Sequence, residues 1–336
     1  MKKIFLLLII FIILFIGILL FFFQTKIATD TKTSPNYFAK LIYETLSRPT
    51  ITHDFSFVIL GLDKRDDWLE KTETTDTIIF SNLNFSQNQI NLIPLPRDLW
   101  SYPLQKKINE IFPLAEKESN KYSFIQSNFS EITGQNIDKT VILTTDNLIK
   151  LTQIINGIDV YLEKGFEDKQ YPNPDYIQNP QSKTPIYITI EFPAGWNHLD
   201  SSNITQFVRS RKSAETVSQG GTDIGRIQRQ ELVLNALFQK MSAIKLTDYS
   251  QFISLYNFWR YDLQTNFSDA DLLSLLLLEN RKIFSLKINK INLPIGENSK
   301  TDILYHPQSF INSQWVFLPQ DKNYESLHQF ITKSLN

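Results

Sequence analysis

The sequence contains no cysteine among its 336 residues. Disulfide bonds, a thiolate nucleophile and a zinc site with cysteine ligands are therefore excluded, although the absence does not decide the compartment. Histidine is scarce, and its four copies are scattered without an H-E-x-x-H motif. The chain also lacks a G-x-S-x-G elbow and a G-x-x-x-x-G-K-[ST] loop. These absences argue against a zinc peptidase, a serine hydrolase and a P-loop NTPase.

Neither sign of charge is in excess, because 34 lysines and arginines oppose 35 acidic residues, for a net charge of −1. A general nucleic-acid binder needs a broad basic surface. The composition therefore predicts that nucleic acid is not a partner. Basic charge is instead concentrated in residues 207–230, FVRSRKSAETVSQGGTDIGRIQRQ.

The second half of this basic stretch predicts a helix over 223–240, with Asp223 at its start. At 100° per residue, Asp223, Arg226 and Gln230 fall within about 60° of one another. Val233 and Leu237 continue the same stripe, so ionic groups occupy the face that should be buried. One interpretation is a pocket that holds an anion, because a buried charge without a partner is costly. The other is an N-cap aspartate followed by a solvated basic face.

The N-terminus contains a long apolar run. Ile4 to Phe23 is 20 residues without a charge and follows Lys2 and Lys3. This length spans a bilayer core of roughly 30 Å, and the preceding lysines favour a cytoplasmic N-terminus. A cleaved signal peptide is the alternative, but no A-x-A-like site follows. We therefore predict a single-pass cell-membrane protein with an extracytoplasmic C-terminal domain.

Three parts follow from this prediction: residues 1–24 with the lysine pair and the membrane anchor, a stalk at 25–53, and one domain at 54–336. Within the stalk, residues 37–46 predict a short amphipathic helix that lies against the membrane or the domain. Within the domain, short apolar strands alternate with helices, which predicts an α/β sandwich with a largely parallel sheet. The predicted strands are 55–62, 78–83, 89–95, 141–144, 158–162 and 186–192, and the predicted helices are 107–117, 122–133 and 146–155. The proline-rich residues 165–185 predict a long loop, either disordered or at the rim of a site.

Charged residues accompany three of the predicted strands. Asp63 and Arg65 follow the first, Asp76 precedes the second, and Arg97 ends the third. Sites in α/β sheets form at strand ends, so these side chains are expected to converge. Two carboxylates with several arginines suit a divalent cation that shares phosphate oxygens. Ordinary turns with surface ion pairs, each contributing about 0–1 kcal/mol, are the alternative for any one loop.

Taken in order, these segments resemble the LytR–CpsA–Psr family of membrane-anchored cell-wall enzymes. Each segment is a weak signal alone, but their order after one apolar span makes the resemblance specific. Thr265-Asn266 and Trp315-Val316 are similar to later landmarks of the family. The matching segments are Gly61-x-Asp63-x-Arg65, Asp76-Thr77, Pro96-Arg97-Asp98, Lys107-Ile108-Asn109, Gly157-Ile158-Asp159-Val160, Arg209-x-Arg211 and Asp223-x-Gly225-Arg226-x-x-Arg229-Gln230.

The resemblance implies a three-layer α/β/α sandwich with a central mixed, largely parallel sheet. It also implies transfer of a glycopolymer from a polyprenyl-pyrophosphate carrier to a wall acceptor such as peptidoglycan. Asp63 and Asp76 would bind Mg²⁺, with Mn²⁺ as an alternative, and Asp223, Arg65 and Arg97 would be catalytic. The pyrophosphate would be bound by Arg65, Arg97, Arg209, Arg211, Arg226, Arg229 and Gln230.

One position departs from the family pattern. The family usually has arginine two residues before the second metal-binding aspartate, where this chain has Thr74. Lys64 and Lys71 are candidates to replace the missing cation. Lys107 and Asn109 match their motif, but they are candidates only for positioning the loop. A polyprenyl-pyrophosphate phosphohydrolase and a non-catalytic protein that binds lipid-linked glycan are therefore alternative functions.

Overall fold

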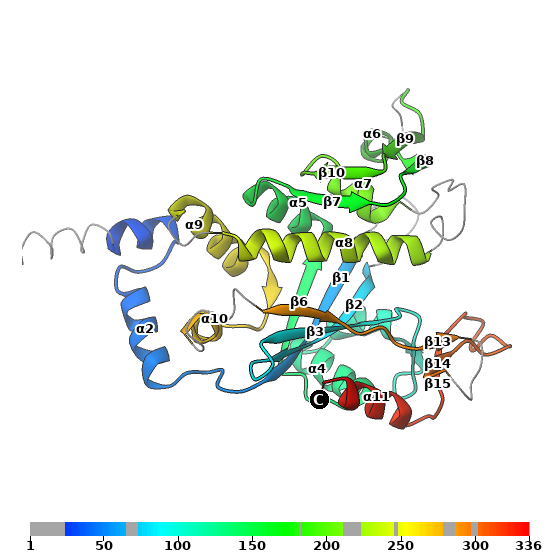
Figure 1. Cartoon of the computed structure of the whole chain (residues 1–336), viewed down its shortest axis with the longest axis horizontal. Helices are drawn as coiled ribbons and strands as arrows, with labels where there is room; N and C mark the ends of the chain where they lie inside the picture. Colours follow the sequence, from blue (N-terminus) through cyan, green and yellow to red (C-terminus); the bar gives the residue numbers. More distant parts are fainter. Residues whose placement is uncertain are drawn as a thin grey trace, which may run out of the picture.

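A six-stranded sheet forms the centre of the molecule, with strand order β11-β6-β1-β2-β3-β12 (Figure 1). The computed structural model describes residues 24–64, 73–179, 181, 183–210, 223–244, 248–277, 286–296 and 302–335. The strands of the central sheet are β1 (Phe55–Lys64), β2 (Glu73–Asn84), β3 (Gln89–Leu95), β6 (Lys139–Thr144), β11 (Gln264–Thr265) and β12 (Lys287–Lys290).

The sheet is mixed, as predicted, but it is not largely parallel. β1 pairs with β6, and β3 with β12, in parallel, whereas the other three neighbouring pairs are antiparallel. The polar segment between β2 and β3 is a four-residue turn, with Asn88 at φ 52°. A connection this short can join only antiparallel strands, so the turn itself was the sequence signal for the correct pairing.

Helices cover both faces of the sheet, which confirms the predicted α/β/α layers (Figure 1). One face buries side chains such as Leu60 and Phe80 against three helices. The other face lies under two helices that carry much of a second hydrophobic core. The helices on the first face are α3 (Ile111–Ala115), α4 (Lys121–Thr133) and α11 (Glu325–Leu335), and those on the second are α5 (Thr145–Ile154) and α8 (Asp223–Ser242).

A smaller unit lies beyond α8, on the side away from the central sheet (Figure 1). It contains two antiparallel strand pairs, β7 with β10 and β8 with β9. The prediction of a long loop at 165–185 is wrong, because β8 takes up its first part and a short helix follows. Pro174 starts that helix at a position where its missing N–H costs nothing. The elements of this unit are β7 (Ile158–Leu162), β8 (Phe166–Pro172), α6 (Pro174–Gln178), β9 (Tyr187–Phe192), β10 (Gly195–Leu199) and α7 (Ile204–Arg209).

The predicted helix over 122–133 is confirmed as α4, and Gly134 follows it with φ 68°. The predicted helix over 107–117 is shorter. Its first residues form β5 (Lys106–Lys107) and a 3₁₀ turn (Ile108–Glu110) before α3 begins. The main-chain N–H of Ile108 donates to the carbonyl of Leu99 at 2.8 Å instead of lying free at a helix start. β5 pairs with β4 (Trp100–Ser101), so this segment is tied to the residues that follow β3.

The region predicted to be a stalk packs against the domain. Residues 24–30 are helical, and α2 (Tyr37–Ser47) contacts α10 (Asp269–Leu277). α9 (Tyr249–Asn257), which runs into a π-helix at Phe258–Asp262, lies on the same side of the molecule (Figure 1). In the part of the chain that the structure describes, no helix is long and apolar enough to cross a membrane. The predicted span Ile4–Phe23 lies outside that part.

The last strands form a separate small sheet. β13 (Ile295–Gly296) pairs in parallel with β14 (Leu304–Tyr305), and β14 pairs antiparallel with β15 (Leu318–Pro319). The carbonyl of Phe317, just before β15, accepts from the N–H of Trp100 at 2.9 Å. The C-terminal region is therefore fastened to the same segment after β3 that carries Arg97.

Candidate active site

A β-bulge lies at Asp76, near the start of β2 and at the end of the central sheet where β1 finishes. Gly61 pairs with Thr77 and Leu62 with Thr75, so Asp76 is an extra residue on β2. The bulge resets the alternation of the strand. Thr75 is buried and its hydroxyl binds the carbonyl of Asn109 at 3.0 Å, whereas Thr77 faces α8. Bulges are frequent beside active sites because they re-aim a side chain, and here that side chain is a predicted metal ligand.

The antiparallel register of β2 and β3 brings Arg97 to Asp76. Ile78 pairs with Leu95, so the residue two places beyond Leu95 lies opposite the bulge. The Nη1 atom of Arg97 contacts Oδ1 of Asp76 at 2.8 Å, and the Asp76 side chain is 9% exposed. The sequence predicted this convergence, and the structure confirms it for these two residues. The side chain of Asp63 and all of Arg65 lie outside the described residues.

Arg97 is held from a second side. Its Nε lies 3.4 Å from Oδ2 of Asp98, and the other oxygen of Asp98 accepts from Nζ of Lys107 at 2.7 Å. Charges therefore alternate in sign from Asp76 through Arg97 and Asp98 to Lys107. All four side chains are at most 23% exposed, which weakens solvent screening between them. The chain of contacts fixes the guanidinium plane of Arg97.

The motif at residues 107–109 does position the loop that carries Arg97. The N–H of Asn109 donates to the carbonyl of Arg97 at 3.2 Å. Its own carbonyl accepts from Thr75, beside Asp76. The side-chain Oδ1 of Asn109 is buried and has no hydrogen-bond partner among the described residues. An oxygen acceptor is thus left open close to the bulge.

The helix α8 brings Gln230 to the start of β2, beside the bulge. The hydroxyl of Thr77 donates to Oε1 of Gln230 at 2.9 Å, so the first half of α8 lies over the start of β2. Asp223 and Arg226 belong to α8, but their side chains lie outside the described residues. Arg209 is the last residue of α7 and is half-buried, and Arg211 lies outside the described residues.

Arg229, predicted to bind the pyrophosphate, makes contacts within the protein in this structure. Its side chain is buried, with 4% of the residue exposed, and its guanidinium lies 4.5 Å from the ring centre of Phe166. The Nε atom donates to the carbonyl of Phe207 at 3.0 Å, and a terminal nitrogen donates to the carbonyl of Ser210. Arg229 thus fastens the main chain at the end of α7, on either side of Arg209.

A buried carboxylate completes this attachment. The hydroxyl of Ser210 donates to Oδ2 of Asp168 at 2.7 Å, and Asp168 is 2% exposed. The sequence missed Asp168, because it lies in the segment that was predicted to be a loop. A signal did exist for Arg229: it shares a face of α8 with Gly225, Val233 and Ala236, all buried.

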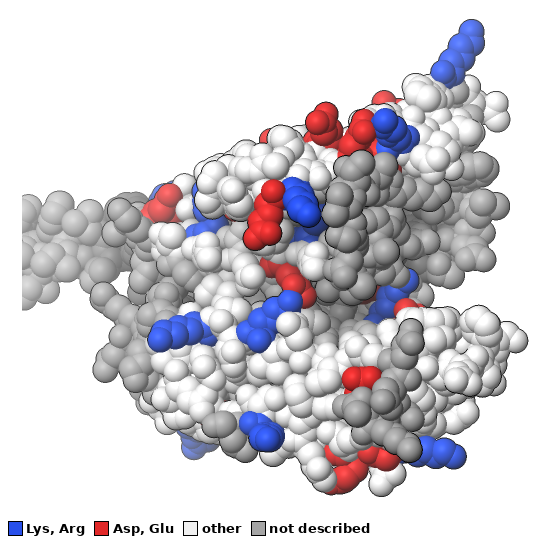
Figure 2. All heavy atoms as spheres, turned by 45° about the vertical axis from the view of Figure 1, so that its right-hand side comes forward, with Lys and Arg blue, Asp and Glu red and all other residues white. Residues whose placement is uncertain are grey.

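On the face drawn in Figure 2, the described basic and acidic side chains are intermixed. Among the described residues, no group of three or more histidine, aspartate or glutamate side chains is arranged to hold a metal ion. The pair Asp63 and Asp76 stays a prediction, because the side chain of Asp63 lies outside the described residues.

Comparison with known proteins gives consistent results. The model of the LytR_cpsA_psr family matches residues 19–329. The polyisoprenyl-teichoic acid–peptidoglycan teichoic acid transferase TagV of Bacillus subtilis (strain 168) is 24% identical over 257 residues, which is 73% of this chain. The chain spans 59% of the length of that relative.

Solved structures show the same fold. The crystal structure of B. subtilis TagV aligns with a TM-score of 0.58 at 21% identity, covering 85% of this chain and 98% of that chain. YwtF (TagT) of Bacillus subtilis with bound octaprenyl pyrophosphate lipid aligns with a TM-score of 0.52 at 17% identity, covering 84% and 91%. Because the family model matches residues 19–329, this chain belongs to the LytR_cpsA_psr family.

Proposed function

We propose that this protein transfers a glycopolymer from a polyprenyl-pyrophosphate carrier to a hydroxyl group of a cell-wall acceptor such as peptidoglycan. Two relatives support the substrate class: TagV is named a teichoic acid transferase acting on peptidoglycan, and TagT has been solved with octaprenyl pyrophosphate. The observation that carries the proposal is the orientation of Arg97. Its guanidinium contacts Asp76 and Asp98, and Gln230 binds Thr77, the residue after Asp76 on β2.

The pyrophosphate would be bound chiefly by arginines, since the planar fork of a guanidinium matches phosphate oxygens. Arg97 is a described member of this set, and Arg209, the last residue of α7, is proposed to be another. Arg65, Arg211, Arg226 and Gln230 are proposed to complete it. Arg229 is proposed to act on the substrate indirectly, through the main chain beside Arg209.

The donor set at the bulge fits a hard divalent cation. Carboxylate and amide oxygens are the ligands that Mg²⁺ accepts, and the open Oδ1 of Asn109 adds an oxygen near Asp76. Asp63 and Asp76 would hold Mg²⁺, or Mn²⁺, when it binds. The ion would supply positive charge next to the pyrophosphate oxygens, where negative charge increases during transfer.

The proposed reaction exchanges one phosphorus–oxygen bond for another. The acceptor hydroxyl attacks the phosphorus nearest the sugar, the bridging bond of the pyrophosphate breaks, and polyprenyl monophosphate leaves. The hydroxyl loses its proton in the process. Asp223, at the start of α8, is proposed to lie beside the attacked phosphorus. Arg65 and Arg97 would stabilise the charge on the departing monophosphate.

Membrane attachment is part of the proposal. The apolar residues 4–23 after Lys2 and Lys3 would anchor the protein as a single-pass membrane protein with its domain outside the cytoplasm. That location would give the domain access to both a lipid-linked donor and the cell wall.

The test combines the purified full chain with a polyprenyl-pyrophosphate glycan, Mg²⁺ and a peptidoglycan acceptor. Transfer predicts polyprenyl monophosphate that appears only when acceptor is present, together with glycan bound to the acceptor. Equal release without acceptor would indicate a phosphohydrolase, and binding without release would indicate a glycan-binding protein. Arg97→Ala should abolish transfer, whereas Lys150→Ala on α5 should leave it unchanged, because Lys150 belongs to an exposed pair with Asp262.

A further inference from the structure

The helix α2 has two apolar faces. Phe38, Leu41 and Thr45 lie toward the domain, and Thr45 is buried. A second, outer stripe is centred about 120° around the helix from the first and contains Ala39, Ile42, Tyr43 and Leu46. At 100° per residue these four positions fall within an arc of about 100°, the width of an ordinary apolar helix face.

The inner face is firmly held. The Phe38 ring lies 5.5 Å from that of Tyr256, and the hydroxyl of Tyr37 donates to Asp269 at the start of α10. Arg260 of the π-helix donates to the Tyr37 hydroxyl at 2.8 Å and stacks over the Tyr37 ring at 4.7 Å. Ion pairing between Arg260 and Asp269 closes this cluster. α2 therefore has a fixed rotation about its axis.

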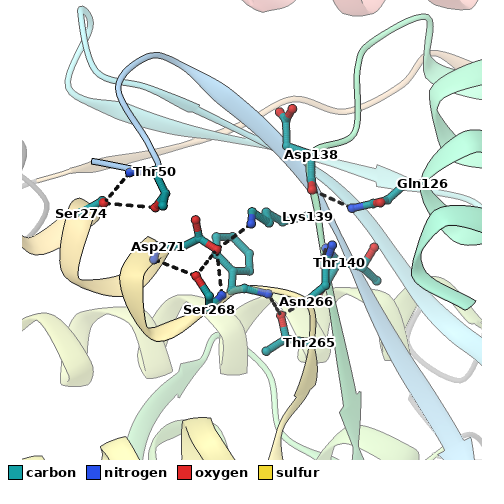
Figure 3. Close-up of polar contacts among 11 residues, drawn as sticks. Thr50, Gln126, Asp138, Lys139, Thr140, Thr265, Asn266, Ser268, Asp271 and Ser274 are labelled. Carbon is teal, nitrogen blue, oxygen red and sulfur yellow. Dashed lines mark hydrogen bonds and ion pairs between the residues drawn. The ribbon is translucent and has the colours of Figure 1, made fainter. Parts of the chain in front are cut away.

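The helix that α2 rests on is itself tied to the central sheet (Figure 3). Asp271 of α10 contacts Nζ of Lys139 on β6 at 2.6 Å. Ser274 accepts from the N–H of Thr50, which follows α2, at 3.0 Å. The outer stripe of α2 therefore keeps one direction relative to the whole domain.

Residues 24–31 are fixed on the same side of the molecule. The hydroxyl of Tyr249 donates to Asp30 at 2.7 Å, and the amide of Asn257 donates to the carbonyl of Asp30 at 2.8 Å. The hydroxyl of Tyr261 donates to the carbonyl of Thr31 at 2.8 Å. The uncharged sequence 4–23 ends immediately before this segment. The described chain therefore begins, at residue 24, beside the group of helices that carries α2.

The outer stripe is strongly exposed. Ile42 is 44% exposed, Leu46 is 65% exposed and Tyr43 is 74% exposed. We propose that this stripe rests on the surface of the lipid bilayer that holds residues 4–23. The inference uses the membrane attachment proposed above but not the transfer chemistry. It assigns the face of the domain that lies against the membrane.

Three properties favour a bilayer as the occupant. The attached apolar segment of 20 residues keeps any membrane next to this face at all times, so binding costs little additional freedom. Tyrosine is enriched at the boundary between lipid and water. Lys40 is exposed about 60° around the helix from Tyr43, where a long basic side chain can reach lipid phosphates.

The absence of cysteine makes the test direct, because one introduced cysteine is the only labelling site. The full chain with Tyr43→Cys, or separately Leu46→Cys, is labelled with a fluorophore and placed in nanodiscs that contain nitroxide-labelled lipid. A helix lying in the interface buries its apolar face about 5–10 Å into the headgroup region. The fluorescence emission of both labels should therefore be several-fold lower in nanodiscs with a nitroxide near the headgroup than in nanodiscs without nitroxide.

The matched control is Trp196→Cys on β10, because Trp196 is 73% exposed and lies in the unit beyond α8. Its label should stay unquenched in the same nanodiscs. Equal quenching at positions 43 and 196, stronger quenching at 196, or failure of the full chain to co-purify with nanodiscs would overturn the inference. A chain that lies on the membrane as proposed but transfers no glycan would contradict the proposed function alone.

Discussion

The guanidinium groups of Arg97 and Arg229 have contrasting surroundings. Arg97 lies between two carboxylates at one end of the central sheet and remains 23% exposed, whereas Arg229 donates to main-chain carbonyls in the core. The sequence assigned both to the pyrophosphate, because a resemblance matches residue types at positions and does not show which way a side chain points. Helix periodicity would have separated Arg229 from Gln230 by about 100°.

Arg229→Ala is expected to reduce the free energy of unfolding by about 3 kcal/mol, because the carbonyls of Phe207 and Ser210 lose charge-assisted hydrogen bonds. Arg209→Ala should show the opposite pattern. It should cost less than about 1 kcal/mol of stability while weakening pyrophosphate-lipid binding by about 1.5–3 kcal/mol. Urea unfolding and lipid-binding titrations of both variants check this. An Arg229→Ala protein of wild-type stability would contradict the role given to Arg229.

Thr74 lies directly opposite Asp63 in the β1–β2 ladder. Side chains at directly opposite positions have Cβ atoms about 5 Å apart, so an arginine at position 74 would add positive charge beside a proposed metal ligand. Thr74→Arg should raise the transfer rate more than the affinity for the lipid, because the added guanidinium stabilises the negative charge that develops in the transition state more than it stabilises the bound substrate. A rise on the order of tenfold corresponds to about 1.4 kcal/mol of barrier. Steady-state kinetics at saturating lipid measure it, and an unchanged or lower rate would refute the expectation.

At the scale of single elements, prediction succeeded where local signals were complete. The turn before β3 and Gly134 after α4 are such signals, because turn and cap conformations depend on a few adjacent residues. The residues of β8 were missed because an irregularity in the register between Asp168 and Tyr171 breaks the alternation of its buried side chains, and the strand depends on pairing with β9. Thr265 and Asn266, noted as landmarks, proved to bind the main chain of Thr140 on β6 (Figure 3).

The start of α10 depends on one carboxylate. Ser268 and Asp271 cap the helix reciprocally, and Lys139 of β6 binds the same carboxylate. Burial tends to raise the pKa of Asp271, but the hydrogen bonds from Lys139 and Ser268 outweigh it and lower the pKa below its ordinary value. Because the folded-state pKa is lowered, this carboxylate stabilises the fold above the unfolded pKa of about 3.9. That contribution disappears as the pH falls through the folded-state pKa.

Asp271→Asn should therefore lower the free energy of unfolding by about 3 kcal/mol near neutral pH, since it leaves Lys139 without its partner. The difference from the wild type should shrink in acid, below the folded-state pKa of Asp271. Urea unfolding of both proteins, near neutral pH and below the folded-state pKa of Asp271, measures this difference in the free energy of unfolding. Asp262→Asn is the control, because its pair with the exposed Lys150 should contribute about 0–1 kcal/mol. A difference that does not depend on pH would show that the charge of Asp271 is unimportant.

For the whole molecule, the sequence predicted the layers, the family and two converging site residues. Residues 24–50, predicted as a stalk, are packed against α9, the π-helix and α10. The helix predicted over 37–46 is present as α2. The two surfaces predicted for it were the membrane and the domain; one face packs on the domain, and the other is proposed to lie on the membrane. The contacts of α2 with Asp269 and Arg260 join positions more than 200 residues apart, which no local pattern reveals.

A chain that begins at His53 should therefore be less stable than one that begins at Gln24. Removal of Tyr37 and Phe38 costs a charge-assisted hydrogen bond and buried aromatic area, together about 4 kcal/mol. For a domain of this size the midpoint of thermal unfolding should fall by roughly 6–7 °C. Differential scanning calorimetry of the two chains measures the shift. Equal midpoints would mean that residues 24–52 behave as a spacer.

The bulge at Asp76 also limits how this chain can change in length. Thr75 and Thr77 already face opposite sides, so loss of the extra residue would keep the alternation but remove the carboxylate that contacts Arg97. A one-residue deletion here would therefore disrupt the site, whereas a deletion between Thr77 and the end of β2 would turn side chains of the core to the opposite face. An added residue between β2 and β3 falls in a surface turn, where each doubling of loop length costs only about 0.6 kcal/mol. Related chains should therefore vary in length at that turn and keep a constant count from Asp76 to the end of β2.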